Sequence, residues 1–93
     1  MIKTFDEFLI TEKKWTEIEP ENIPYDRARP KDAIMVEYDL GRGVMIDYYI
    51  ARGSNEWMKS GIHPNTTINK GNIIKEIKDR QINKELVSIK INF

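Results

Sequence analysis

His63 is the only histidine in the chain, and imidazole is the side chain best suited to proton transfer near neutral pH. It follows Gly61 and precedes Pro64, a loop-like context that could expose the ring as a general base. A base also needs a nucleophile and an orienting group beside it, and no motif in the sequence supplies them. A surface loop residue is therefore the favoured interpretation of His63, and a small hydrolase that uses it is the alternative.

Metal and phosphate chemistry find little support in the residue spacing. The chain has no cysteine, which excludes a disulfide scaffold, a thiolate zinc site and a cysteine nucleophile. The carboxylates of Asp6, Glu7 and Asp26 are not grouped with further ligands. Residues 41–43, Gly-Arg-Gly, are too few for a phosphate-binding loop and lack its lysine and hydroxyl, so a turn explains them better. We expect no catalytic residues, no metal and no organic cofactor.

Aromatic and arginine side chains are the remaining residues with a chemical use, because they are enriched at the energetic centres of protein interfaces. The alternative for each is that it packs in the core, and this applies most to the two tryptophans. The candidate protein-binding residues are Tyr25, Arg27, Arg29, Tyr49 and Trp57.

A nucleic-acid platform is a second use for some of these residues. Tyr48, Tyr49 and Trp57 beside Arg42 and Arg52 could stack single-stranded bases on a sheet. Strand alternation, however, sends Tyr48 and Tyr49 to opposite faces, and strand aromatics are more often core residues. Nucleic-acid binding is therefore the less favoured interpretation.

Length and composition limit the class of protein. The 93 residues fit one small domain, and 40% hydrophobic with 32% charged residues is a composition that can fold. Fifteen basic and fifteen acidic residues give a formal charge of zero, which predicts no general attraction to nucleic acid or to an anionic membrane. No apolar run approaches the ~20 residues of a transmembrane helix, so we expect a cytosolic protein with no membrane partner.

The pattern of elements predicts an α+β fold: a small, mostly antiparallel sheet with a central β-hairpin, an N-terminal helix, and one helix of the C-terminal half packed on the sheet. Thr4 and Glu7 form a capping-box pattern for the first helix. Residues 15–30 contain three prolines and are expected to be an irregular connector. Two period-two runs joined by a three-residue loop at residues 41–43 predict a hairpin over residues 33–51.

The second half of the chain is expected to supply a helix and a last strand. Residues 54–60 fit either a short helix or a third strand, and the pattern does not separate the two. Asn72 is expected to cap a helix over residues 73–81, and the alternation in residues 86–93 predicts a strand. Residues 1–12 form a leader and residues 13–93 a single domain in this scheme.

The hairpin also carries a prediction about the core. If Ile34, Val36, Ile46 and Ile50 share one face, that face must be buried for so small a sheet to be stable. Truncation of Ile46 to alanine is then expected to cost about 2–5 kcal/mol of unfolding free energy.

Residues 3–12 read Lys-Thr-Phe-Asp-Glu-Phe-Leu-Ile-Thr-Glu. This segment resembles the amino-terminal capsid-targeting peptide of the internal head proteins of T4-like bacteriophages, with one extra residue before the motif and one before the final glutamate. Those peptides end in an aliphatic-any-glutamate site that the prohead protease cuts. Ile10, Thr11 and Glu12 match this site, so the resemblance implies a mature chain of 81 residues (93 minus 12) that begins at Lys13.

The resemblance also implies a biological setting. Internal head proteins are packaged in the virion and injected with the genome, and one known role in that family is to inhibit a host restriction nuclease. By this resemblance the chain is a phage protein of the virion interior and then of the host bacterial cytoplasm. It would bind and inhibit a host defence or restriction enzyme by protein-protein contact.

A delivery peptide must be accessible to a protease and dispensable for folding. We expect deletion of residues 1–12 to lower the free energy of unfolding by no more than about 1 kcal/mol. A structural helix would behave otherwise, because burial of Phe5, Phe8 and Leu9 at about 1.5–3 kcal/mol each would contribute several kcal/mol. Urea midpoints of the full chain and of residues 13–93 decide between a delivery peptide and a structural helix. A shorter chain that cannot fold would contradict the delivery interpretation.

Overall fold

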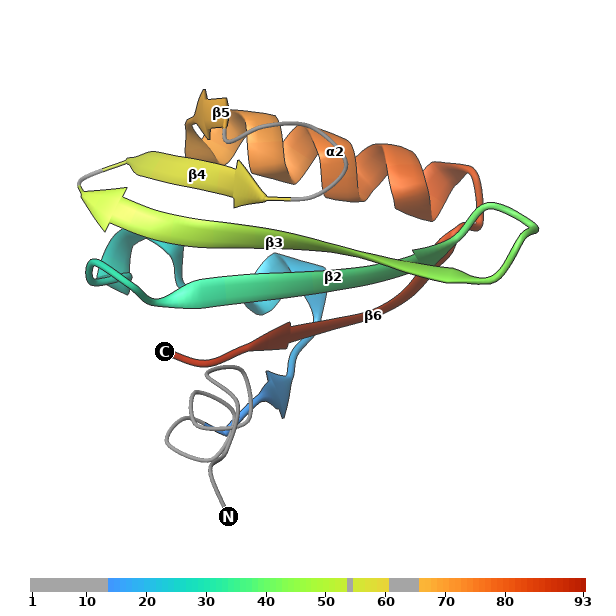
Figure 1. Cartoon of the computed structure of the whole chain (residues 1–93), viewed down its shortest axis with the longest axis horizontal. Helices are drawn as coiled ribbons and strands as arrows, with labels where there is room; N and C mark the ends of the chain where they lie inside the picture. Colours follow the sequence, from blue (N-terminus) through green and yellow to red (C-terminus); the bar gives the residue numbers. More distant parts are fainter. Residues whose placement is uncertain (1–13, 54, 61–65) are drawn as a thin grey trace, which may run out of the picture.

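The computed structural model describes residues 14–53, 55–60 and 66–93, which form a six-stranded antiparallel sheet with one helix packed on it (Figure 1). The strand order is β1-β6-β2-β3-β4-β5. The strands are β1 (Thr16–Glu17), β2 (Ala33–Asp39), β3 (Val44–Gly53), β4 (Glu56–Ser60), β5 (Thr66–Ile68) and β6 (Leu86–Ile91), and the helix is α2 (Lys70–Ile82). The predicted α+β fold is thus confirmed for these elements, whereas the predicted N-terminal helix lies outside the described residues.

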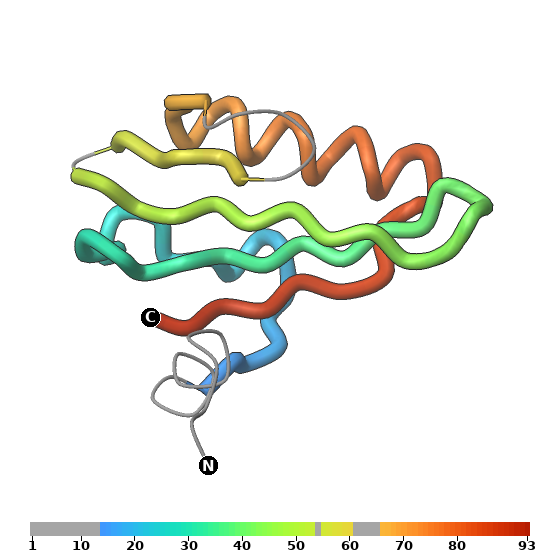
Figure 2. Tube along the Cα trace, viewed as in Figure 1, coloured from blue at the N-terminus to red at the C-terminus, as the bar shows by residue number. Residues whose placement is uncertain are grey.

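Helix α2 explains how the last strand enters the sheet. Thirteen residues of helix span about 20 Å, the length of a six-residue strand. The helix therefore returns the chain along the sheet, and β6 can run back antiparallel to β2. Figure 2 shows the outcome: β6 lies between β1 and β2, so the first and last described strands are neighbours. In the described part of the chain, no helix has the length and apolar character required to cross a membrane.

The β2–β3 hairpin confirms the predicted pair of strands but corrects the predicted loop. Asp39 pairs with Val44, so the loop is four residues long and not three. Gly41 and Gly43 take the positive φ values of 97° and 114° that only glycine adopts easily. The Asp39 carboxylate accepts hydrogen bonds from the backbone N–H groups of Gly41 (2.7 Å) and Gly43 (3.3 Å), which hold the loop.

The longer loop moves the register by one residue, which exchanges the two faces of β3. Ile34 and Val36 are buried as predicted, but their neighbours across the hairpin are Tyr49 and Asp47. Ile46 pairs with Glu37 on the other face and is 41% exposed. The expectation that Ile46 is a core residue was therefore wrong, and so was the large cost assigned to its truncation; Ile50, on the same face, is only half-buried.

Residues 54–60, left open between helix and strand, contain β4. Trp57 pairs with Ala51 on one side and Ile68 on the other, and its indole lies in the core. Asn55, with a φ of 52°, makes the turn into the strand. The strand is favoured because it places one large aromatic between two neighbouring strands and under the helix.

Helix α2 begins three residues earlier than expected, so the prediction of Asn72 as the N-cap was wrong. Asn69 is the N-cap and Asn72 the third helical residue, and each side chain accepts a hydrogen bond from the backbone N–H of the other at 3.0–3.1 Å. This capping box satisfies two donors that the helix itself leaves unpaired. The helix buries Ile73 and Ile77 against the sheet, whereas the neighbouring Ile74 is exposed.

The connector over residues 15–30 is irregular, as predicted, except for β1. It contains the short 3-10 helices η1 (Pro20–Asn22) and η2 (Tyr25–Arg27). It also contributes to the core, since Ile23 is buried and Ile18, Tyr25 and Ala28 pack against the core cluster. The connector thus closes the end of the layer between sheet and helix that α2 does not fill.

The corrected register makes a testable distinction between two isoleucines of one hairpin. Ile34→Ala is expected to lower the free energy of unfolding by about 2–5 kcal/mol, because Ile34 is fully buried. Ile46→Ala is expected to cost less than about 1 kcal/mol, because that side chain is exposed. Urea unfolding of the two variants checks both, and equal losses would contradict the register.

Candidate functional site

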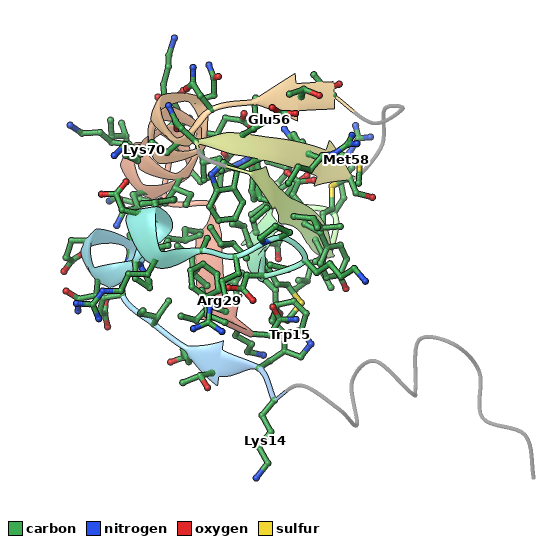
Figure 3. All side chains as sticks on the ribbon, turned by 90° about the vertical axis from the view of Figure 1, so that its left-hand side faces the viewer. Lys14, Trp15, Arg29, Glu56, Met58 and Lys70 are labelled. Carbon is green, nitrogen blue, oxygen red and sulfur yellow. The ribbon has the colours of Figure 1, made fainter. Side chains whose placement is uncertain are left out.

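Among the described residues, no helix packs on one face of the sheet. We call it the open face; register assigns to it alternate residues of the strands, and α2 packs on the opposite side. Figure 3 shows Trp15 and Met58 on the side of the sheet away from α2 and Lys70. The main side chains of the open face are Trp15, Met35, Glu37, Val44, Ile46, Tyr48, Ile50, Met58 and Lys90.

An apolar stripe runs along β3 on this face. Val44, Ile46 and Tyr48 are 55%, 41% and 37% exposed, which is unusual for three successive same-face residues of a central strand. Trp15 contacts Tyr48, with ring centroids 6.1 Å apart at an angle of 54°. Because β6 and β2 separate β1 from β3, the indole reaches over two strands toward the stripe. The result is a continuous aromatic and aliphatic surface.

The charged residues at the β1–β6–β2 side of the open face show no excess of cations. The Lys90 ammonium forms an ion pair with the Glu37 carboxylate at 3.0 Å, and Glu17 lies beside Lys90 in the register. Phosphate-binding faces need cations in excess, since phosphate contacts supply most of the affinity for nucleic acid. The open face instead has the composition of a protein interface, apolar at its centre and polar beside it.

The five residues predicted to bind protein do not form one surface. Tyr49 and Trp57 are buried in the layer under α2, so neither is available to a partner, and the prediction for them was wrong. Tyr25 is half-buried and packs edge-on against Trp57, with ring centroids 6.1 Å apart. Arg27 and Arg29 are exposed, as a surface contact requires.

Other predicted features have mixed outcomes. Tyr48 and Tyr49 point to opposite faces, as alternation predicted, which removes the stacking platform that would have used both. The protease site at Ile10, Thr11 and Glu12 lies outside the described residues, and so does His63.

A polar cluster under α2 was not foreseen from the sequence. The buried Asp47 carboxylate accepts a hydrogen bond from the Tyr38 hydroxyl at 3.3 Å and lies 3.9 Å from the Lys59 ammonium. Lys59 also pairs with Glu76 of α2, whose carboxylate accepts a hydrogen bond from the Tyr49 hydroxyl at 3.0 Å. The correct hairpin register is the signal that would have found this cluster, because it turns Asp47 and Tyr49 toward the helix.

Tyrosine ionisation is suppressed in this layer. Burial and the neighbouring Glu76 raise the pKa of Tyr49 far above its ordinary value, and burial together with Asp47 raises the pKa of Tyr38. Burial alone raises the pKa of Tyr25 to about 12. These hydroxyls therefore stay protonated near neutral pH, and those of Tyr49 and Tyr38 donate hydrogen bonds to Glu76 and Asp47. Among the described residues no group of three carboxylate or imidazole side chains could hold a metal ion.

Arg80, near the end of α2, lies over the Tyr38 ring, with the guanidinium carbon 3.9 Å from its centroid, and pairs with Glu85 at 3.2 Å. Asp47, Lys59, Glu76, Arg80 and Glu85 thus each have a partner of opposite charge. The cluster is suited to holding α2 on the sheet, because Glu76 of the helix contacts Lys59 and Tyr49 of the sheet.

Comparison with known proteins gives no relative: no protein-family model, no curated protein and no solved structure matches this chain significantly. The geometry of the open face is therefore the main support for a functional inference.

The buried tyrosines predict how stability changes in alkali. Their folded pKa values exceed the ordinary 10.0, so above pH 10 the unfolded chain releases protons that the folded chain retains. The stabilisation is complete below about pH 10 and is lost as pH rises toward 12. Urea midpoints across this range should fall, and less steeply in a Tyr25→Phe variant; an unchanged slope would contradict the assignment for Tyr25.

Proposed function

We propose that this chain is a binding protein that uses the open face of its sheet to contact a partner protein and block the partner's activity. The observation that carries the proposal is the exposed stripe of Val44, Ile46 and Tyr48 with Trp15 beside it. Contiguous apolar surface of this kind on a soluble domain typically marks an interaction site.

The energetics of the stripe favour a protein partner. Burial of one exposed aliphatic or aromatic side chain contributes up to about 1.5–3 kcal/mol before the costs of association. Tyrosine and tryptophan are the residues most enriched among those that dominate interface energies. Trp15 and Tyr48 are already in contact, so less side-chain freedom is lost when a partner covers them.

The resemblance of residues 3–12 to a capsid-targeting peptide indicates which class of protein the partner belongs to. We propose a phage protein that is packaged in the virion, processed after Glu12, delivered to the bacterial cytoplasm, and directed there against a host defence or restriction enzyme. Inhibition by contact requires neither a catalytic residue nor a cofactor of the inhibitor. Mass spectrometry of purified virions should then detect a chain that begins at Lys13.

Two other functions are separable by experiment. A nucleic-acid-binding domain would use Trp15 and Tyr48 as stacking surfaces, and its affinity would fall steeply with salt. The ion pair of Lys90 with Glu37 disfavours it, because the cation is already neutralised. A hydrolase would lose its activity in a His63→Ala variant.

A pair of matched substitutions tests the open face. Ile46→Glu places a charge in the stripe, whereas Ile82→Glu places one on α2, where the isoleucine is 68% exposed. Both variants are expected to fold, because neither side chain is buried. Protection of unmodified phage DNA in a restricting host, measured as plating efficiency with the protein expressed, should be lost with Ile46→Glu and kept with Ile82→Glu.

A photo-crosslinking residue at position 46 gives a direct readout. It should attach to one host protein, the same residue at position 82 should not, and Tyr48→Ala should reduce the yield. Equal crosslinking at both positions, or protection unaffected by Ile46→Glu, would contradict the use of this face.

A further inference from the structure

A hollow of about 580 Å³ lies where β1, the end of β6 and the turn before β2 meet. Its volume is within the range of small-molecule sites, ~300–1,000 Å³. Phe93 forms part of its wall and stacks on Trp57 of the core layer, with ring centroids 6.3 Å apart. The other walls include Lys14, Thr16, Arg29, Asp32 and Asn92.

The backbone of Arg29 forms two hydrogen bonds with Asp32, and the Arg29 guanidinium takes part in neither of them. The Arg29 backbone N–H donates to the Asp32 carboxylate at 2.8 Å, and the Asp32 N–H donates back to the Arg29 carbonyl at 2.9 Å. Within the described part of the chain, neither the Arg29 guanidinium nor the Lys14 ammonium forms an ion pair. Figure 3 shows Arg29 beside β1 and Lys14 at the start of that strand.

Asn92 contributes a fixed donor. Its side-chain oxygen accepts a hydrogen bond from the Ala33 N–H at 2.8 Å, and its own N–H donates to the Ala33 carbonyl at 3.1 Å. The Asn92 side-chain oxygen therefore already accepts a hydrogen bond from the backbone, and the side-chain NH₂ group can donate to a ligand. Among the described residues of the wall, Lys14 and Arg29 against Asp32 leave one positive charge in excess (two minus one).

We propose that this hollow is an oxyanion site that takes a carboxylate or phosphate group between the Arg29 guanidinium and the Asn92 amide. A guanidinium presents two parallel N–H donors that match either group, and the amide adds a donor from another direction. The anion comes either from an acidic side chain of a bound protein or from a free phosphate compound. The site is separate from the proposed binding stripe, since Val44, Ile46 and Tyr48 do not line it.

Two-dimensional NMR of the full chain tests the site with sodium phosphate and with N-acetyl-glutamate amide as probes, against sodium chloride at equal ionic strength. Saturable shifts are expected at the amides of Arg29, Asp32 and Asn92. Tighter binding of the glutamate compound assigns the site to a protein side chain, and tighter binding of phosphate assigns it to a free phosphate compound.

Three variants complete the test. Arg29→Gln should weaken binding about tenfold or more, the scale of one lost charge-assisted hydrogen bond. Asn92→Asp keeps an acceptor for the Ala33 N–H but replaces the donor with a negative charge, so it should abolish binding. Arg27→Gln is the matched control, since Arg27 is exposed on η2 and does not line the hollow. Shifts that do not saturate, or equal effects of Arg29→Gln and Arg27→Gln, would overturn the proposal.

Discussion

The pairing of Asp39 with Val44 across the hairpin is the constraint on which the rest of the structure depends. Side chains of a strand alternate with a period of two, so a single residue of loop length decides which set of β3 side chains meets the helix. The four-residue loop turns Asp47, Tyr49 and Ala51 inward. It also leaves Val44, Ile46 and Tyr48 outside. The core and the candidate binding surface are thus two consequences of one register.

The inward set imposes a further requirement, because it brings a carboxylate into the core layer. A buried charge without a partner is costly, and Asp47 is accommodated by the Tyr38 hydroxyl and the nearby Lys59 ammonium. Lys59 in turn pairs with Glu76, which also accepts from Tyr49. Three strands are thereby connected to α2 through polar contacts at defined positions. Burial of Ile73 and Ile77 stabilises the contact between helix and sheet, but apolar contacts do not depend on one exact position. The hydrogen bonds and ion pairs of the polar cluster do, so they fix the position of α2 along the sheet.

Local patterns in the sequence predicted the positions of the strands and of the helix well, but they predicted poorly which side of a strand is buried. The hairpin, α2 and β6 follow from periodicity and from glycine and asparagine signals that act over a few residues. The face of β3 does not, because both of its alternating series contain apolar residues: Ile46 and Ile50 in one, Tyr49 and Ala51 in the other. Long-range pairing resolves the ambiguity, as it does for Trp57, whose strand is defined by neighbours at Ala51 and Ile68. The same error misplaced Tyr49 as a surface anchor and left the open face unrecognised.

The two edges of the sheet explain why a face, and not an edge, is the natural surface for a partner. In the described part of the chain β1 has two residues and β5 has three, so neither of these edge strands offers the long unpaired ladder on which another chain adds a strand. Short edges also limit aggregation, which matters for a domain that exposes an apolar stripe. Affinity on the open face must then come from side chains such as Trp15, Ile46 and Tyr48. Because Ile46 and Tyr48 lie outside the core cluster, they can be replaced at little cost to folding, so recognition can change while the fold is kept.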